Sequence, residues 1–202
     1  MQQWDYRIFS VINNLVGQSK FLDLVMFITA KWGAILFVLI LVGLFFSGKD
    51  LKTKTDNRKA VIKGVMSAFT ALAINQLIGF MYFRPRPFAT HAVNLLIDRS
   101  PDPSFPSDHA TGASSLSFAV FSSHPVIGAL MFVFTILMII SRVYVGTHYP
   151  LDVLGGVLTG FFGSYVIEKA WPMCENWVIK LLDLWESSTV RIFNRETNSH
   201  QK

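Results

Sequence analysis

The chain is poor in cysteine and in charge. Its only cysteine is Cys174, which excludes an internal disulfide and a cysteine-rich zinc site. Charged residues make up 15% of the sequence, whereas a typical soluble domain has about 25%. The first residues include Asp5 and Arg7 and lack a small-residue cleavage site, so we expect no cleavable signal peptide. The sequence also has no internal repeat and no low-complexity segment.

Hydrophobic residues make up 51% of the 202 residues and occur in long blocks, which predict membrane-spanning helices. We expect an all-α, polytopic membrane helical bundle with five spans, at residues 22–47, 64–83, 110–123, 126–140 and 153–171. The third and fourth blocks are each short for a span and are separated by the turn sequence 122–125, so they predict a helical hairpin. The simplest organisation is one integral-membrane domain over residues 1–202, with a core at 22–171 and an amphipathic tail at 173–202.

Both ends of the chain carry amphipathic segments. In residues 4–16, one helical face carries Trp4, Ile8, Val11, Ile12 and Leu15. This pattern leaves open whether the short helix lies in the membrane interface, dips into it, or caps the bundle. In the tail, Trp177, Leu181 and Trp185 repeat at helical spacing and predict an interfacial helix. Pro172 is expected to separate that helix from the last span.

The net charge is +5, and most of the basic residues lie in one segment and in the tail. Residues 48–63 contain Lys49, Lys52, Lys54, Arg58, Lys59 and Lys63. A short connection this basic is expected to stay on the cytoplasmic side, so lipid headgroups and topology explain the charge better than nucleic acid does. Counting spans from this loop places the polar segments 84–109 and 141–152 together on the outer face.

Two arginines alternate with two prolines at the end of the second expected span. Arg84 and Arg86 are each followed by proline, which prevents the helix from continuing and stiffens the backbone. Guanidinium groups match phosphate oxygens and stabilise charge on five-coordinate phosphorus. Taken alone, such arginine-proline pairs are commonly interfacial anchors.

A second polar string, Pro106-Ser107-Asp108-His109, stands directly before an apolar helix that is expected to begin near Ala110. Ser107 or Asp108 suits the N-cap, and the free N–H groups at a helix start bind anions. His109 would then stand beside a bound phosphate, where a protonated imidazole can give its proton to a leaving oxygen. Taken alone, such a string is often only a helix cap.

The third polar string carries a histidine and an aspartate four residues apart. In a helix, His148 and Asp152 would share one face. A carboxylate on one imidazole nitrogen fixes the tautomer and makes the other nitrogen a better nucleophile. Pro150 suits the first turn of a helix, which indicates a turn-to-helix junction between them. Arg142, near the end of the preceding span, is a further candidate for binding phosphate.

Together the three strings resemble the signature of the type 2 phosphatidic acid phosphatase superfamily. The matching residues are Arg86 and Pro87; Pro106, Ser107 and His109; and Ser141, Arg142, His148 and Asp152. Residues 82–88 and 104–109 look specifically like the bacitracin-resistance branch of bacterial undecaprenyl-diphosphate phosphatases, which shares the aspartate at Asp108. The specific similarity covers residues 75–156.

The resemblance implies a metal-independent hydrolase without a cofactor. It would release phosphate from undecaprenyl diphosphate, recycle the cell-wall lipid carrier and give bacitracin resistance. The implied nucleophile is His148, which forms a phosphohistidine, while Asp152 orients it and His109 protonates the leaving group. The residues expected to bind the phosphoryl group are Arg86, Arg142 and Ser107, with Arg84 and Asp108 added as neighbours. The implied location is the bacterial inner membrane, with membrane lipids as partners and the site facing the periplasm or exterior.

Two positions depart from the family signature. The family lysine would fall on Gly79 or Leu77, neither of which is basic, so Arg84 is the candidate to replace it. Asp108 stands where the family usually has glycine. The sequence leaves open whether Asp108 pairs with an arginine or biases selection towards diphosphates.

Other functions stay open at this point. A phosphatidic acid or phosphatidylglycerol-phosphate phosphatase, or a lipid phosphotransferase, would use the same motifs. A transporter of an anionic lipid would also place polar groups within spans, although the sequence has no repeated pair of interrupted spans. A metal-dependent phosphatase would use Asp108, His109, His148 and Asp152 as ligands, but the arginines already supply positive charge. Lipid preference and oligomeric state are not determined by the sequence.

Overall fold

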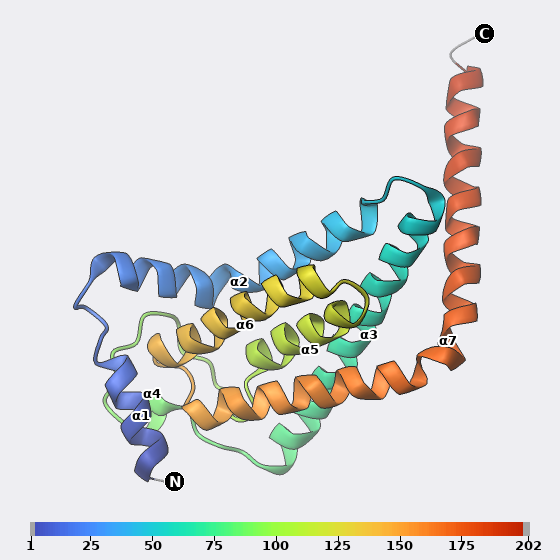
Figure 1. Ribbon diagram of the computed structural model, residues 1–202. Helices are drawn as coiled ribbons and strands as arrows, with labels where there is room; N and C mark the ends of the chain where they lie inside the picture. The colour runs from blue at the N-terminus through green and yellow to red at the C-terminus, as the bar shows by residue number, and fades with distance from the viewer. Residues whose placement is uncertain (1–2, 200–202) are drawn as a thin grey trace.

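The structure is a computed structural model that describes residues 3–199, with side chains described up to residue 187, and this part of the chain contains helices and no strand. In chain order the helices are α1 (Gln3–Asn13), α2 (Lys20–Phe46), α3 (Leu51–Met81), α4 (Pro87–Thr90), α5 (Asp108–Ser123), α6 (Pro125–Tyr144) and α7 (Pro150–Ser199) (Figure 1). Four helices are long and apolar enough to cross a membrane: α2, α3, α6 and the part of α7 over Pro150–Ser187. The expected all-α, polytopic membrane architecture is confirmed.

The central helix of the bundle is α5, which packs against α3, α6 and α7. The expected hairpin at 110–123 and 126–140 is confirmed as α5 and α6, joined at His124. The 16 residues of α5 extend about 24 Å at ~1.5 Å per residue, which is less than the hydrocarbon thickness of ~30 Å. Whether α5 counts as a fifth span therefore stays a prediction.

Small residues let α7 pack directly on its neighbours. A Cβ at Gly160 would lie 2.1 Å from Oγ of Ser114 in α5, and one at Gly163 would lie 2.6 Å from Cβ of Ala71 in α3. Lipid tails are as apolar as leucine, so helices in a bilayer are held together largely by such close backbone packing. These contacts fix the position of α7, whose first turn carries Asp152.

The basic segment 48–63, expected to be a loop, is mostly helical. The α3 helix begins at Leu51, and its N-cap Asp50 accepts a hydrogen bond from the backbone N–H of Thr53 at 2.8 Å. Lysine and arginine are good helix formers, so a capped start at Asp50 lets the helix run through the basic stretch into the span. The expectation of a loop is wrong from residue 51 onward.

Pro172 lies inside α7 and does not end it. The helix continues from Pro150 to Ser199, and Figure 1 shows that it changes direction sharply along its length. Proline removes one backbone hydrogen bond and crowds the preceding turn, so a proline inside a helix bends it. The expected break is wrong, and the tail is a bent extension of the last span. Its interfacial location stays a prediction, and residues 200–202 of the tail lie outside the described residues.

Beyond the bend, α7 packs across the end of the bundle where α2 and α3 meet. Arg58 of α3 pairs with Glu186, and its guanidinium lies over the rings of Trp185 and Phe45. Two further ion pairs join the basic start of α3 to α7, from Lys59 to Glu175 at 3.0 Å and from Lys63 to Glu168 at 2.7 Å. The basic end of the molecule is therefore held to α7 by charge.

The opposite end of the bundle gathers α1, α4 and the polar connections (left in Figure 1). The α1 helix is packed against this end through Asp5, Phe9 and Asn13, which are buried. Its apolar stripe, including Trp4 and Val11, stays exposed. The position of α1 relative to the membrane surface stays a prediction.

Candidate active site

His148 lies in the connection between α6 and α7 and is 2% exposed. Its Nδ1 is 2.8 Å from the backbone oxygen of Ser104. Because a carbonyl oxygen can only accept, Nδ1 carries the proton and Nε2 carries the lone pair. Burial lowers the pKa of His148 well below its ordinary value, and the positive charges of Arg142 and Arg86 lower it further. The imidazole is therefore neutral at neutral pH and nucleophilic at Nε2.

Arg86 lies against this lone pair. Its Nη1 is 3.2 Å from Nε2 of His148 and 3.2 Å from the backbone oxygen of Thr147. Asp102 holds the other side of the guanidinium, with its carboxylate 2.7 Å from Nη2 and its backbone oxygen 3.1 Å from Nε. The structure thus brings the first and third polar strings of the sequence together.

Asp152 supports His148 through an intermediate residue. Its Oδ2 is 3.8 Å from Nδ1 of His148, which is ion-pair distance and too long for a hydrogen bond. That oxygen accepts instead from Oγ of Ser104 at 2.5 Å and from the backbone N–H of Tyr149 at 2.8 Å. Ser104 therefore stands between the carboxylate and the imidazole, in place of the direct bond expected from the four-residue spacing.

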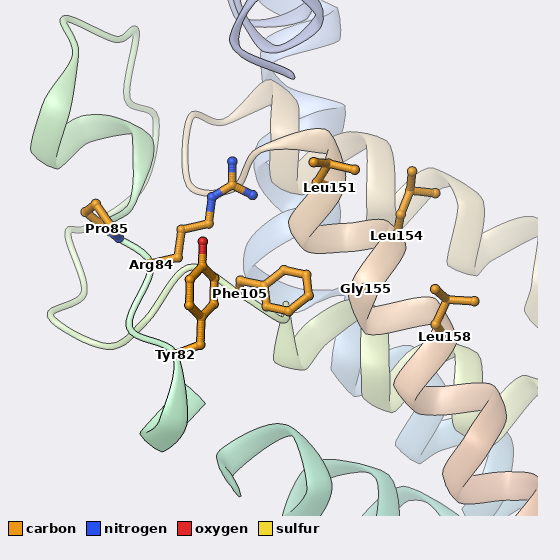
Figure 2. A pocket seen from close by; sticks show the side chains of 8 residues that line it. All are labelled: Tyr82, Arg84, Pro85, Phe105, Leu151, Leu154, Gly155 and Leu158. Atoms are coloured by element: carbon orange, nitrogen blue, oxygen red, sulfur yellow. The ribbon is translucent and has the colours of Figure 1, made fainter. Parts of the chain in front are cut away.

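Arg84, expected to contact phosphate, is turned towards two carboxylates. Its Nη1 and Nη2 donate to Asp152 and Asp5, each at 2.5 Å, and its guanidinium lies over the ring of Tyr149. Figure 2 shows the side chain extending towards the first turn of α7, beside Tyr82 and Phe105. These residues line an apolar cavity of about 860 Å³ together with leucines of α7. With both ends of its fork occupied by carboxylates, Arg84 suits a supporting role better than a phosphate contact.

Two other expected phosphate ligands present polar atoms without a partner. Arg142, at the end of α6, is 6% exposed and donates from Nη1 to the backbone oxygen of Ala30 at 3.0 Å. Its Nε and the Oγ of fully buried Ser107 have no hydrogen-bond partner among the described residues. A buried donor without a partner is costly, and an anion would satisfy both atoms.

The first turn of α5 carries Asp108 and His109. His109 lies within electrostatic range of Arg86, Arg142 and His148. Asp108 is held by two side-chain amides of α3, since Asn75 donates to it at 2.7 Å and Gln76 at 3.2 Å. The pairing of Asp108 with an arginine, left open by the sequence, is not what the structure has.

Asp108 and His109 also border an apolar cavity of about 420 Å³. Its lining comes from α2, α3, α5 and α6, and includes Phe37, Leu72 and Met138. The polar site at the end of the bundle is thus continuous with a hydrophobic space among helices that cross the membrane.

The sequence matches the PAP2 superfamily over residues 60–174, which is more than half of the chain. The chain belongs to the PAP2 superfamily. It is 31% identical to undecaprenyl-diphosphatase BcrC of Bacillus subtilis (strain 168), over 97% of this chain and 99% of that protein. It is also 31% identical to putative undecaprenyl-diphosphatase YbjG of Escherichia coli (strain K12), over 65% of this chain and 67% of that protein.

Two solved structures of related fold agree with this PAP2 assignment. The crystal structure of Aquifex aeolicus LpxE superposes with a TM-score of 0.65 at 25% identity, covering 83% of this chain and 96% of that one. The first transmembrane PAP2 type phosphatidylglycerolphosphate phosphatase from Bacillus subtilis gives 0.58 at 22% identity, covering 83% and 86%. The second likeness concerns the fold alone. The expected superfamily and its membrane helical fold are confirmed.

The residues suggested as metal ligands are used differently in this PAP2 site. Within the described part of the chain, no three His, Cys, Asp or Glu side chains are grouped so that they could hold a metal ion. Asp108 is held by amides, and Asp152 by Arg84 and Ser104. The polar groups of the site therefore suit the binding of an anion by arginine side chains.

Three residues that support the PAP2 site were not identified from the sequence. Ser104 contacts His148 through its backbone oxygen, which any residue type supplies, so no sequence signal exists for it. Asp102 belongs to none of the three polar strings, and only its distance to Arg86 reveals its role. Asp5 had one signal, because it is the only acid in the amphipathic segment 4–16.

Proposed function

We propose that this protein is an undecaprenyl-diphosphate phosphatase, which hydrolyses undecaprenyl diphosphate to undecaprenyl phosphate and phosphate. The observation that carries the proposal is the environment of His148: a neutral imidazole with its proton fixed on Nδ1 and its lone pair facing Arg86. The names of the BcrC and YbjG relatives support the choice of substrate.

In the first step, the terminal phosphoryl group is bound by Arg86, Arg142 and Ser107. A phosphate oxygen that accepts from Nη1 of Arg86 draws this donor away from Nε2, so that substrate binding releases the nucleophile's lone pair. Nε2 then attacks phosphorus, and the bond from phosphorus to the bridging oxygen breaks. The negative charge of the bound diphosphate favours the protonated form of His109, which donates its proton to the leaving undecaprenyl phosphate.

In the second step, water hydrolyses the phosphohistidine. His109, now neutral, takes a proton from the attacking water, the phosphorus–Nε2 bond breaks, and phosphate leaves. The carbonyl of Ser104 and the nearby Asp152 stabilise the positive charge that His148 carries as a phosphoimidazolium.

The apolar cavity beside His109 supports a lipid substrate. Its lining of aliphatic and aromatic side chains suits a polyprenyl tail that lies in the bilayer while the diphosphate reaches the polar end of the bundle. The basic end, at the start of α3, is proposed to face the cytoplasm of a bacterial cell. The site would then face the periplasm or exterior, where the enzyme recycles the cell-wall lipid carrier and confers bacitracin resistance.

The test is phosphate release by detergent-purified protein in excess chelator, with undecaprenyl diphosphate and phosphatidic acid as parallel substrates. We expect the unmodified protein to release phosphate from undecaprenyl diphosphate. The His148→Ala variant should release none from this substrate. The matched control is His124→Ala, at the turn between α5 and α6, which should retain activity. Alkaline quenching should trap phosphate on the peptide that contains His148, since phosphohistidine is stable in base.

Three results would count against the proposal. Near-normal turnover by His148→Ala would remove the nucleophile. A clear preference for phosphatidic acid would indicate another lipid phosphatase of the superfamily. Activity lost in chelator and restored by a divalent ion would replace the phosphohistidine scheme with metal-assisted hydrolysis.

A further inference from the structure

Asp5 of α1 is a buried carboxylate that the mechanism above does not use. It is 0% exposed, and it accepts hydrogen bonds from the backbone N–H of Leu151 at 3.0 Å and from Nη2 of Arg84 at 2.5 Å. Burying a charge is costly unless the charge is paired, and a neutral acceptor would satisfy the N–H of Leu151 at lower cost. The hydrogen bond to Leu151 alone therefore does not explain why a charged residue is buried at this position.

Arg84 connects Asp5 to the groups that hold the nucleophile. Its Nη1 donates to Oδ1 of Asp152 at 2.5 Å, and Oδ2 of Asp152 accepts from Oγ of Ser104 at 2.5 Å. The backbone oxygen of Ser104 accepts the Nδ1 proton of His148 at 2.8 Å. The contacts run without a gap from α1 to the imidazole.

The α1 helix also holds the backbone on the far side of His148. Leu151, whose N–H is bound by Asp5, belongs to the first turn of α7, directly before Asp152. Phe9 packs its ring on that of Tyr149, with centroids 5.5 Å apart. The residues that follow His148 in the chain are thus fixed by the same short helix.

We propose that Asp5 is a positioning residue for His148, and that the N-terminal helix α1 is therefore part of the active site. With carboxylates at both ends, the fork of Arg84 is held in one orientation. Without the Asp5 charge, Arg84 turns wholly to Asp152 and draws it from Ser104, whose carbonyl then no longer fixes the imidazole. The inference rests on the proposed function only in taking His148 as the nucleophile.

The effect of Asp5 should fall on kcat and spare KM, because Asp5 touches none of the phosphate ligands. Asp5→Asn keeps the size and an acceptor oxygen while removing the charge. We expect kcat for phosphate release to fall about tenfold or more, since small displacements of a reacting group cost this much or more. KM should stay unchanged, and the control Asp98→Asn, an exposed acid of the outer connection, should behave as the unmodified protein.

Unchanged kcat in folded Asp5→Asn protein, or a rise in KM with kcat intact, would overturn the inference. If Asp5→Asn does not fold, Asp5→Glu replaces it, since the longer side chain pushes Arg84 off its position with the charge kept. We then expect kcat to fall about threefold or more at constant KM. Wild-type kcat in Asp5→Glu would overturn the inference equally.

A spectroscopic measurement separates this inference from the proposed function. In protein labelled with ¹⁵N-histidine, the imidazole resonances of His148, assigned with His148→Gln, should report the Nδ1–H tautomer. In Asp5→Asn they should report a mixture of tautomers, and an unchanged spectrum would overturn the inference. This measurement needs no substrate. If the unmodified protein failed to release phosphate, the proposed function would be removed, and the spectrum would still decide whether Asp5 positions His148.

Discussion

At the scale of single residues, the site depends on the protonation of His148. Arg86, Arg142 and Asp102 act on its imidazole from three different segments, and Asp152 lies 3.8 Å from Nδ1. Burial and the two arginines lower its pKa, so the neutral, nucleophilic form persists to lower pH than for an ordinary histidine. In the proposed mechanism, the arginines thus bind phosphate and also keep the nucleophile unprotonated.

This dual role predicts a shift in the pH profile. Removing one positive charge with Arg142→Gln makes the imidazolium easier to form and raises the pKa of His148. The acid limb of kcat/KM for phosphate release should therefore move to higher pH, in addition to a general loss of activity from the missing phosphate contact. The control Arg99→Gln changes an exposed arginine of the outer connection and should leave the limb in place. A limb that stays in place or moves to lower pH in Arg142→Gln would contradict the assignment.

The residues that act through side chains of distinctive type could be predicted from the sequence. His148, His109, Arg86 and Arg142 are brought to one end of the bundle, as their motifs indicated. The contacts of Arg84 could not be predicted, because its partner Asp5 is distant in sequence and lies in a helix that shares no motif with it. Sequence spacing also suggested a direct bond from Asp152 to His148, whereas α7 begins only at Pro150, after His148, and Ser104 contacts both residues.

At the scale of helices, the spans were predictable from hydropathy, and their ends were not. Asp50 starts α3 within the basic segment, and Pro172 bends α7 where a break was expected. The basic composition of 48–63 suggested a loop, and Pro172 suggested a helix end, but in both places the chain is helical. The ion pairs from Lys59 and Lys63 to α7 add a tertiary reason for α3 to begin early.

The packing of α7 on α5 predicts a difference between two glycines. Gly160→Ala would place a Cβ 2.1 Å from Oγ of Ser114, whereas a Cβ at Gly43 of α2 meets nothing within 4 Å. Overpacking of this kind costs about 1–3 kcal/mol of unfolding free energy, while an alanine in an open helical position gains up to about 1 kcal/mol. Thermal unfolding in detergent should show a lower midpoint for Gly160→Ala and an equal or higher one for Gly43→Ala. Equal midpoints for both variants would contradict the packing.

At the scale of the whole molecule, the two ends of the bundle differ in chemistry. One end carries the basic start of α3 and the bend of α7, and the other carries α1 and the residues proposed to bind phosphate. The positive-inside rule concerns short basic connections, and we expect it to hold here with the first end in the cytoplasm even though the basic residues are helical. A substrate that is dephosphorylated outside the cell requires this orientation.

The orientation predicts which engineered thiols can be labelled in intact bacteria. In a Cys174→Ser background, which removes the single native thiol, Asp98→Cys and Lys49→Cys each place one cysteine at an exposed position, at opposite ends of the bundle. A membrane-impermeant maleimide should label Asp98→Cys in intact cells, because this position lies on the side of His148. Lys49→Cys should react only after the membrane is permeabilised. The reverse pattern would place the site in the cytoplasm, and an extracytoplasmic phosphatase would then be excluded even if the purified protein released phosphate from the same lipid.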